Sequence, residues 1–221
     1  MRHILFAFAF AFAFALPLAA IAGSSDISKI NGAVRVEAAQ QAGDVSTVNG
    51  AVHIGDGAIV HKASTVNGAV ELGDKAQASA VDTVNGAIAL GAASHVSGTV
   101  QAVNGSIRLN KGAEAIGHVS NVNGAITLDG AHVAGGIETV GGDITVGADS
   151  RVEGGLLVDE NHSWFHFGSS RVPQVLIGPH AVVQGTLEFR REVVLKVSDS
   201  AQIGPVKGAT PVRFSGATPA N

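Results

Sequence analysis

The chain of 221 residues has no cysteine, no tyrosine and a single tryptophan. The absence of cysteine excludes disulfides, thiolate metal sites and thiol nucleophiles. No Phe, Trp or Tyr occurs between Ser24 and Asn161. Because a globular core of this size normally relies on large aromatic side chains for buried area, this long stretch argues against a compact globular domain.

Charge is also scarce. Charged residues make up 14% of the chain and hydrophobic residues 46%, a balance that argues against intrinsic disorder. The formal net charge of −4 argues against a general affinity for nucleic acid. We therefore expect an ordered protein without nucleic-acid partners.

Residues 1–22 have the composition of a secretory signal peptide. A basic start precedes an apolar run over residues 4–22, and Ala20-Ile21-Ala22 forms an A-x-A cleavage site before Gly23. The run is nearly long enough to span a bilayer, so an uncleaved membrane anchor is the alternative. Cleavage is favoured and predicts a periplasmic or secreted protein, with membrane contact only through an uncleaved N-terminal segment.

The chain does contain a clear internal repeat. Val-Asn-Gly or a close relative recurs every 18 or 19 residues, with its asparagines at Asn31, Asn49, Asn67, Asn85, Asn104 and Asn123. A seventh copy degrades to Val140-Gly141-Gly142. A fixed period of this length indicates a repeat architecture. Because Asn and Gly tolerate positive φ, we expect a corner at each triplet and a ladder of stacked Asn amides along the axis.

The residues three and five positions after each Asn are aliphatic, as at Val52 and Ile54, whereas the residue between them varies. This alternation is typical of a short half-buried strand. Inward aliphatic residues are expected about every six positions, at Val48, Ile54 and Val60 for example. The sequence therefore predicts an all-β fold: a single-stranded parallel β-helix of about nine or ten rungs, each with about 18 residues and three short strands.

The pattern continues beyond residue 150 with one interruption over residues 159–173, which contain Trp164, Phe165 and Phe167. We expect a loop insertion, whose aromatic residues either contact a partner or pack over the solenoid. His162 and His166 flank Trp164 at a spacing that would suit a metal on a helix, but an ordered loop is preferred.

The domain organisation follows from these features. The solenoid is expected over residues 23–207, followed by a flexible tail over residues 208–221. The element over residues 187–197, which holds the charged residues Arg190, Arg191 and Glu192, is expected to cap the C-terminal end, whereas the first rung is expected to be bare.

The strings Leu90-Gly-Ala-Ala-Ser-His-Val-Ser-Gly-Thr-Val100 and Val146-Gly-Ala-Asp-Ser-Arg-Val-Glu-Gly-Gly-Leu156 resemble the repeat of bactofilins, as does Ile177-Gly-Pro-His-Ala-Val-Val-Gln-Gly-Thr-Leu187. Bactofilins are bacterial polymer-forming cytoskeletal proteins built on a β-helix. The Thr-Val-Asn-Gly-Ala rhythm is also similar to adhesin-type β-solenoid families of bacterial envelopes. The resemblance implies a right-handed coil and assembly into polymers, but it carries no catalytic residues. The signal peptide and the Trp164 loop depart from the bactofilin pattern.

Few residues suggest chemistry. The histidines lie at different distances from their repeat Asn, which predicts different columns and surface roles: His53, His61, His95, His118 and His132. The repeat also resembles the left-handed helix of hexapeptide acyltransferases, which need a catalytic His. Asp56 and Asp74 share a column, but the glycine-rich calcium nonapeptide is absent. We therefore predict no catalytic residue, no metal and no cofactor.

Together these features predict a non-enzymatic, exported structural protein of the bacterial envelope that forms a homo-oligomer or polymer. An adhesin-like module that binds an envelope protein or a glycan through Trp164, Phe165 and Phe167 is the alternative. A hexapeptide-type acyltransferase is the less favoured one.

Overall fold

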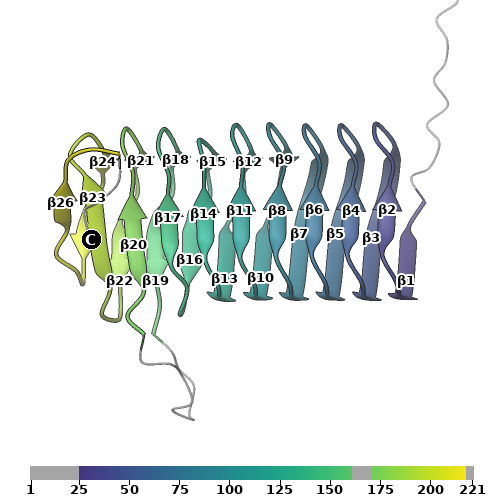
Figure 1. The fold of residues 1–221 in the computed structure, drawn as a ribbon, viewed down its shortest axis with the longest axis horizontal. Helices are drawn as coiled ribbons and strands as arrows, with labels where there is room; N and C mark the ends of the chain where they lie inside the picture. The colour runs from purple at the N-terminus through teal and green to yellow at the C-terminus, as the bar shows by residue number, and fades with distance from the viewer. Residues whose placement is uncertain (1–24, 161–170, 218–221) are drawn as a thin grey trace, which may run out of the picture.

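The structure is a computed structural model that describes residues 25–160 and 171–217. All regular elements of this part are strands, and they stack into one parallel solenoid (Figure 1). The described residues include no helix long and apolar enough to cross a membrane. The predicted signal peptide lies outside them.

One face of the solenoid is a sheet of 10 strands, here called the narrow sheet, with one strand for each turn. Its strands are β2 (Val34–Val36), β4 (Val52–Ile54), β6 (Val70–Leu72), β8 (Ile88–Leu90), β11 (Ile107–Leu109), β14 (Ile126–Leu128), β17 (Ile144–Val146), β20 (Gln174–Ile177), β23 (Val194–Ser198) and β26 (Val212–Phe214).

The remaining 16 strands form the wide sheet, which folds around the other side. These are β1 (Ile27–Asn31), β3 (Gln41–Asn49), β5 (Ile59–Asn67), β7 (Gln77–Asn85), β9 (His95–Val96), β10 (Val100–Asn104), β12 (Glu114–Ala115), β13 (Val119–Asn123), β15 (His132–Val133), β16 (Ile137–Thr139), β18 (Arg151–Val152), β19 (Leu156–Val158), β21 (Val182–Val183), β22 (Leu187–Phe189), β24 (Gln202–Ile203) and β25 (Val206–Lys207).

Equivalent repeat positions lie opposite each other in every pair of neighbouring strands. Val52 pairs with Val70, and Asn49 pairs with Asn67, 18 residues further along the chain. The predicted all-β parallel solenoid with rungs of about 18 residues is therefore confirmed, and the strands of the narrow sheet mark 10 turns. The right-handed coil stays a prediction.

The prediction of three short strands in every rung is wrong for the early rungs. There β3, β5 and β7 each run unbroken for nine residues around the bend of the wide sheet. From the next rung on, two short strands replace each long one. The change coincides with one extra residue at Ser97-Gly98-Thr99, because Ala78 pairs with Val96 but Val81 pairs with Val100. The added residue interrupts the strand without breaking the stack.

The core is a narrow column of small aliphatic side chains. In the second rung the inward residues include Val52, Ile54, Ala58, Val60 and Ala63, each at most 3% exposed. The one aromatic residue among the buried hydrophobic side chains of the described part is Phe189. This core has little room for rings, which accounts for the aromatic-free sequence.

Glycine follows Asn because successive rungs touch at this corner. A Cβ atom at Gly86 would overlap the carbonyl oxygen of Gly68, and one at Gly105 would overlap that of Gly86. The expectation that Asn and Gly both adopt positive φ is wrong, because no described Asn has a positive φ. Of the corner glycines, Gly32, Gly50 and Gly124 have one, whereas Gly68, Gly86 and Gly105 do not. Close backbone approach is therefore the main reason for glycine here.

The C-terminal end departs from expectation in two ways. Strand β26 pairs with β23, so residues 212–214 belong to the stack and not to a flexible tail. The element over residues 187–197 does not cap the end, because a further rung follows it. Its charged residues 190–192 form a corner between β22 and β23, where Arg191 donates a hydrogen bond to the carbonyl oxygen of Val140. Sequence reasoning stopped one strand too early because the last rung lacks the Val-Asn-Gly signal.

The insertion lies between two rungs that pair normally. Strand β20 pairs with β17, so that Val146 lies opposite Ile177 across the additional residues. Trp164, Phe165 and Phe167 lie outside the described residues, as do His162 and His166, so the predictions made for them stay predictions.

Candidate functional site

The six repeat asparagines lie in one column along an edge of the solenoid. From Asn49 onward, each Nδ2 donates to the Oδ1 of the Asn one rung earlier, at 3.0–3.1 Å. The ladder runs through Asn31, Asn49, Asn67, Asn85, Asn104 and Asn123. All donors point toward the N-terminus. Because every bond joins two neighbouring rungs, the ladder is a structural link between them.

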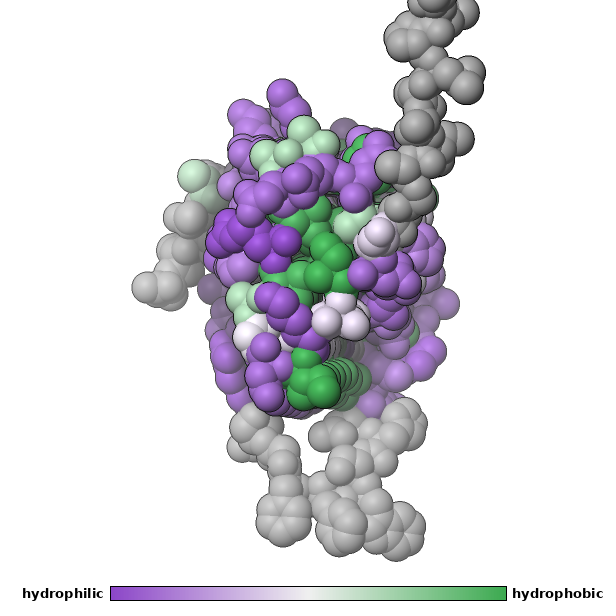
Figure 2. Space-filling view, turned by 90° about the vertical axis from the view of Figure 1, so that its right-hand side faces the viewer, coloured by the Kyte–Doolittle hydropathy of each residue, from purple (hydrophilic) through white to green (hydrophobic). Residues whose placement is uncertain are grey.

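Beside the ladder lies a row of exposed aliphatic side chains, here called the valine column. Its members are Ile30, Val48, Val66, Val84, Val103, Val122 and Val140. From Val48 to Val122 each is 39–41% exposed, and Ile30 is 72% exposed. The prediction that Val48 points inward is therefore wrong. Figure 2, which views the solenoid from its N-terminal end, shows a hydrophobic row receding along the lower edge.

The inward position is taken instead by the preceding residue. Thr47, Thr65 and Thr83 are 4–5% exposed, and each hydroxyl donates to the carbonyl oxygen of the Gly that follows the Asn one rung earlier. These hydrogen bonds satisfy buried hydroxyls and hold the corners together. Sequence reasoning missed them because it counted the aliphatic Val as the inward residue, although strict alternation from the neighbouring inward Val45 would have placed Thr47 inside.

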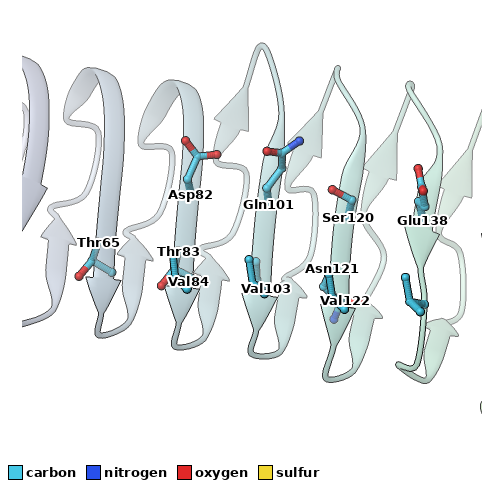
Figure 3. A pocket seen from close by; sticks show the side chains of 12 residues that line it. Thr65, Asp82, Thr83, Val84, Gln101, Val103, Ser120, Asn121, Val122 and Glu138 are labelled. Carbon is cyan, nitrogen blue, oxygen red and sulfur yellow. The ribbon is translucent and has the colours of Figure 1, made fainter. Parts of the chain in front are cut away.

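On the other side of the valine column lies a second row, here called the polar row: Ser46, Ser64, Asp82, Gln101, Ser120 and Glu138. Asp82 accepts a bond from Lys62 at 2.7 Å, which raises the pKa of Lys62. An open groove of about 430 Å³ lies along the middle of these two rows (Figure 3). Its lining includes the later members of both rows: Asp82, Gln101, Ser120 and Glu138 from the polar row, and Val84, Val103, Val122 and Val140 from the valine column.

A column of alternating charge lies on the other part of the wide sheet. Glu114 pairs in register with His95 on one side and with His132 on the other. The Nδ1 atoms of both histidines lie 2.9 Å from the carboxylate of Glu114. Because an ionised carboxylate only accepts, each Nδ1 carries the hydrogen. The prediction that these histidines occupy different columns is wrong.

The error has a local cause. His95 lies five residues after Leu90, whereas His132 lies four residues after Leu128, because the corner over residues 129–131 is one residue shorter. Counting from the repeat Asn therefore misplaced one of two side chains that share a column.

The carboxylates of this column are stabilised in their ionised form. The hydrogen bond from His132, followed by that from His95, lowers the pKa of Glu114. Glu153 has a lowered pKa, first through the hydrogen bond from Arg151 and then through His132. The Nε2 atom of His132 lies 3.3 Å from the carboxylate of Glu153, within ion-pair distance.

Most other described histidines also meet a carboxylate of an adjacent rung. His53 lies 2.9 Å from Glu71, and His61 lies 2.6 Å from Asp44. Pairs of this kind join neighbouring rungs across the surface. In the part of the chain that the structure describes, no three His, Asp or Glu side chains converge to hold a metal ion.

Asp56 and Asp74 do share a column, but their carboxylates bind backbone. The Oδ1 of Asp56 accepts the N–H of Asp74 at 2.9 Å, and the Oδ1 of Asp74 accepts the N–H of Ala92 at 2.7 Å. Each carboxylate thus caps the corner of the next rung.

The two ends of the stack differ in their exposed edges. Strand β2 pairs with β4 only, because no earlier rung precedes it among the described residues. The N–H of Val34 and the carbonyl of Val36 both bond to the second rung. Since these groups alternate in direction along a strand, the N–H and carbonyl of Arg35 point to the open side. At the other end, Pro205 and Pro211 precede β25 and β26.

Comparison of the chain with protein-family models, curated proteins and solved structures finds no match. The structure defines the class of the protein, a parallel β-solenoid with a long repeat ladder. The resemblance to bactofilins therefore rests on the repeat residues alone.

Proposed function

We propose that the chain is an exported, non-enzymatic structural protein of the bacterial envelope that associates end to end through its first rung. The observation that carries the proposal is the open backbone edge at Arg35. Unpaired N–H and C=O groups on an edge strand offer a template for pairing with another chain. Figure 2 views this end and shows hydrophobic residues among polar ones on its face.

The contrast between the two ends supports the choice of the N-terminal one. Proline lacks an N–H and is a common device for blunting a sheet edge. Pro205 and Pro211 stand directly before the last strands, whereas the first rung has no proline between Ser25 and Asn49. The N-terminal edge is therefore the better template for further strands.

Export and the envelope location rest on residues 1–22, and the polymer analogy rests on the bactofilin-like repeat. The inter-rung bonds of the Asn ladder and of the His–carboxylate pairs support a structural role, because these polar side chains are used to tie one rung to the next.

The test uses the protein from Gly23 onward, examined by sedimentation velocity and electron microscopy. The natural sequence should form elongated assemblies. Arg35→Pro removes the outward N–H and should abolish them, whereas Arg35→Ala removes only the side chain and should assemble normally. Circular dichroism should show that both variants keep the solenoid. A strict monomer at high concentration, or an Arg35→Pro variant that assembles as well as the natural sequence, would contradict the proposal.

A further inference from the structure

We propose that the valine column is a docking surface for a second copy of this chain, which packs side by side with the first in antiparallel orientation. A row of side chains about 40% exposed, from Val48 to Val122, forms a continuous apolar strip along the axis. Contiguous exposed apolar surface of this kind marks an interaction site more often than scattered apolar residues do.

The spacing of the valines along the strip indicates which partner fits it. One valine stands on each rung, and rungs are about 4.8 Å apart. A second row with the same period can place one side chain against each side chain of the first along its whole length. A surface with a different period would fit at only one or two places. A second copy carries the required period by construction.

The polar row favours the antiparallel arrangement. When a two-fold axis crosses the strip at right angles between Val84 and Val103, each polar row faces the other in reverse order. Asp82 then lies opposite Gln101, and Glu138 lies opposite Ser46. No carboxylate faces a carboxylate, and the amide of Gln101 can donate to Asp82. A parallel pair, related by rotation about the long axis, would instead place each polar row over the Asn ladder of the other copy, whose amides already bond one another, so Asp82 and Gln101 would not meet.

The size of the strip sets the strength of the contact. Seven rungs at about 4.8 Å span about 29 Å, and three adjacent rows are about 15 Å wide with their side chains. Each copy would thus contribute on the order of 400 Å², about half of what a standard stable interface contributes per partner. The dimer should therefore be weak and reversible, and populated only at high protein concentration.

This surface is separate from the open edge used in the proposed function. The valine column runs along the side of the stack, whereas Arg35 marks its end. The two contacts can be tested independently if side-by-side pairing is measured in the Arg35→Pro background, where end-to-end assembly is expected to be absent.

Because the chain has no cysteine of its own, introduced cysteines can form disulfides only with each other. In the antiparallel dimer Val48 of one copy lies opposite Val140 of the other. Val48→Cys and Val140→Cys variants with different affinity tags, mixed and mildly oxidised, should form the mixed disulfide in preference to either homodimer. Arg108→Cys, exposed on the narrow sheet, is the control for random collision and should give only background cross-linking.

Two cross-linking results would overturn the proposal. One is mixed disulfide no more abundant than the Arg108→Cys background. The other is a Val48→Cys homodimer that forms as readily as the mixed species, because this pairing requires parallel chains. A Val84→Lys and Val103→Lys double variant supplies a second measurement. It should remain folded by circular dichroism and lose the concentration-dependent dimer in sedimentation equilibrium. Dimerisation unchanged in this variant would also overturn the proposal.

Discussion

At the Asn-Gly corners one glycine per rung lies against the glycine of the rung before. Glycine is therefore required at these corners because a side chain would not fit between the rungs, and not because the turn needs a flexible residue. The buried threonines depend on the same corner, because the hydroxyl of Thr83 donates to the carbonyl oxygen of Gly68. A side chain added here would push two rungs apart and break this bond.

We therefore predict that Gly86→Ala destabilises the solenoid by several kcal/mol, since its Cβ would overlap the backbone of Gly68. Gly57→Ala is the matched control. Gly57 has a φ of +65° and no atom within 4 Å of an added Cβ, and Ala39 and Ala93 have similar φ values at the equivalent corners. The control should cost about 1 kcal/mol. Urea denaturation of both variants measures the difference, and similar midpoints would show that the corner has room to relax.

Some side-chain directions can be predicted from the sequence, and others cannot. The inward pairs such as Val52 and Ile54 follow from alternation over three residues. The direction of Val48 does not follow from the spacing of aliphatic residues, because β3 runs on through the bend and fixes the alternation from Val45 to Thr47. A polar Thr inside the core is understandable only once the carbonyl of the neighbouring rung is in place.

At the scale of strands, the column of His95, Glu114 and His132 joins β9, β12 and β15 across two rung boundaries. The sequence contained all three residues but not their alignment. A corner that gains or loses one residue changes the sequence distance between equivalent positions of two rungs, but it leaves the register of the strands unchanged. The alignment of the three side chains therefore follows from the backbone pairing, which only the structure shows.

This column predicts a pH dependence of stability. The pKa of Glu114 is lowered from its ordinary 4.5 in the folded protein. A group of this kind stabilises the folded state above its unfolded pKa, and the contribution is lost as the pH falls through the lower folded pKa. The natural sequence should therefore lose melting temperature below about pH 4.5.

Glu114→Gln removes the titrating group. Its melting temperature should lie below that of the natural sequence near pH 6, and the difference should shrink as the pH falls below 4.5, the ordinary pKa of Glu114. Glu37→Gln is the control, because Glu37 is exposed and has no ion pair among the described residues. Thermal melts over a pH series give the answer. A difference between Glu114→Gln and the natural sequence that stays constant with pH would argue against this linkage.

At the scale of the whole molecule, each rung contacts mainly its two neighbours, and the rungs of the early repeats are nearly interchangeable. The overall fold was predictable because period and alternation repeat along the chain, so that one misjudged position does not alter the architecture. The last rung was harder to predict, because Val212–Phe214 joins the stack through backbone pairing with β23 and carries no repeat triplet.

Near-interchangeable rungs predict that one complete rung can be removed. Deletion of residues 50–67 joins Asn49 to Gly68 and restores the sequence Val-Asn-Gly-Ala-Val. Strand β3 then meets β7 with Thr47 opposite Thr83 and Asn49 opposite Asn85, so the core and the amide ladder close again. The shortened protein should unfold cooperatively, with an unfolding enthalpy lower by about a tenth because enthalpy scales with chain length. Small-angle scattering should show a particle shorter by about 4.8 Å.

Deletion of residues 50–58 is the informative control, because it removes fewer residues but takes out β4 and the corner after it. Strands β2 and β6 would then face each other across a missing rung, and the inward residues Val34 and Val70 would lose their shared neighbour. This variant should be much less stable than the full-rung deletion, although it is the longer chain. If both deletions destabilise equally, stability depends on rung-specific contacts, such as the bond between Lys62 and Asp82, more than on the repeat itself.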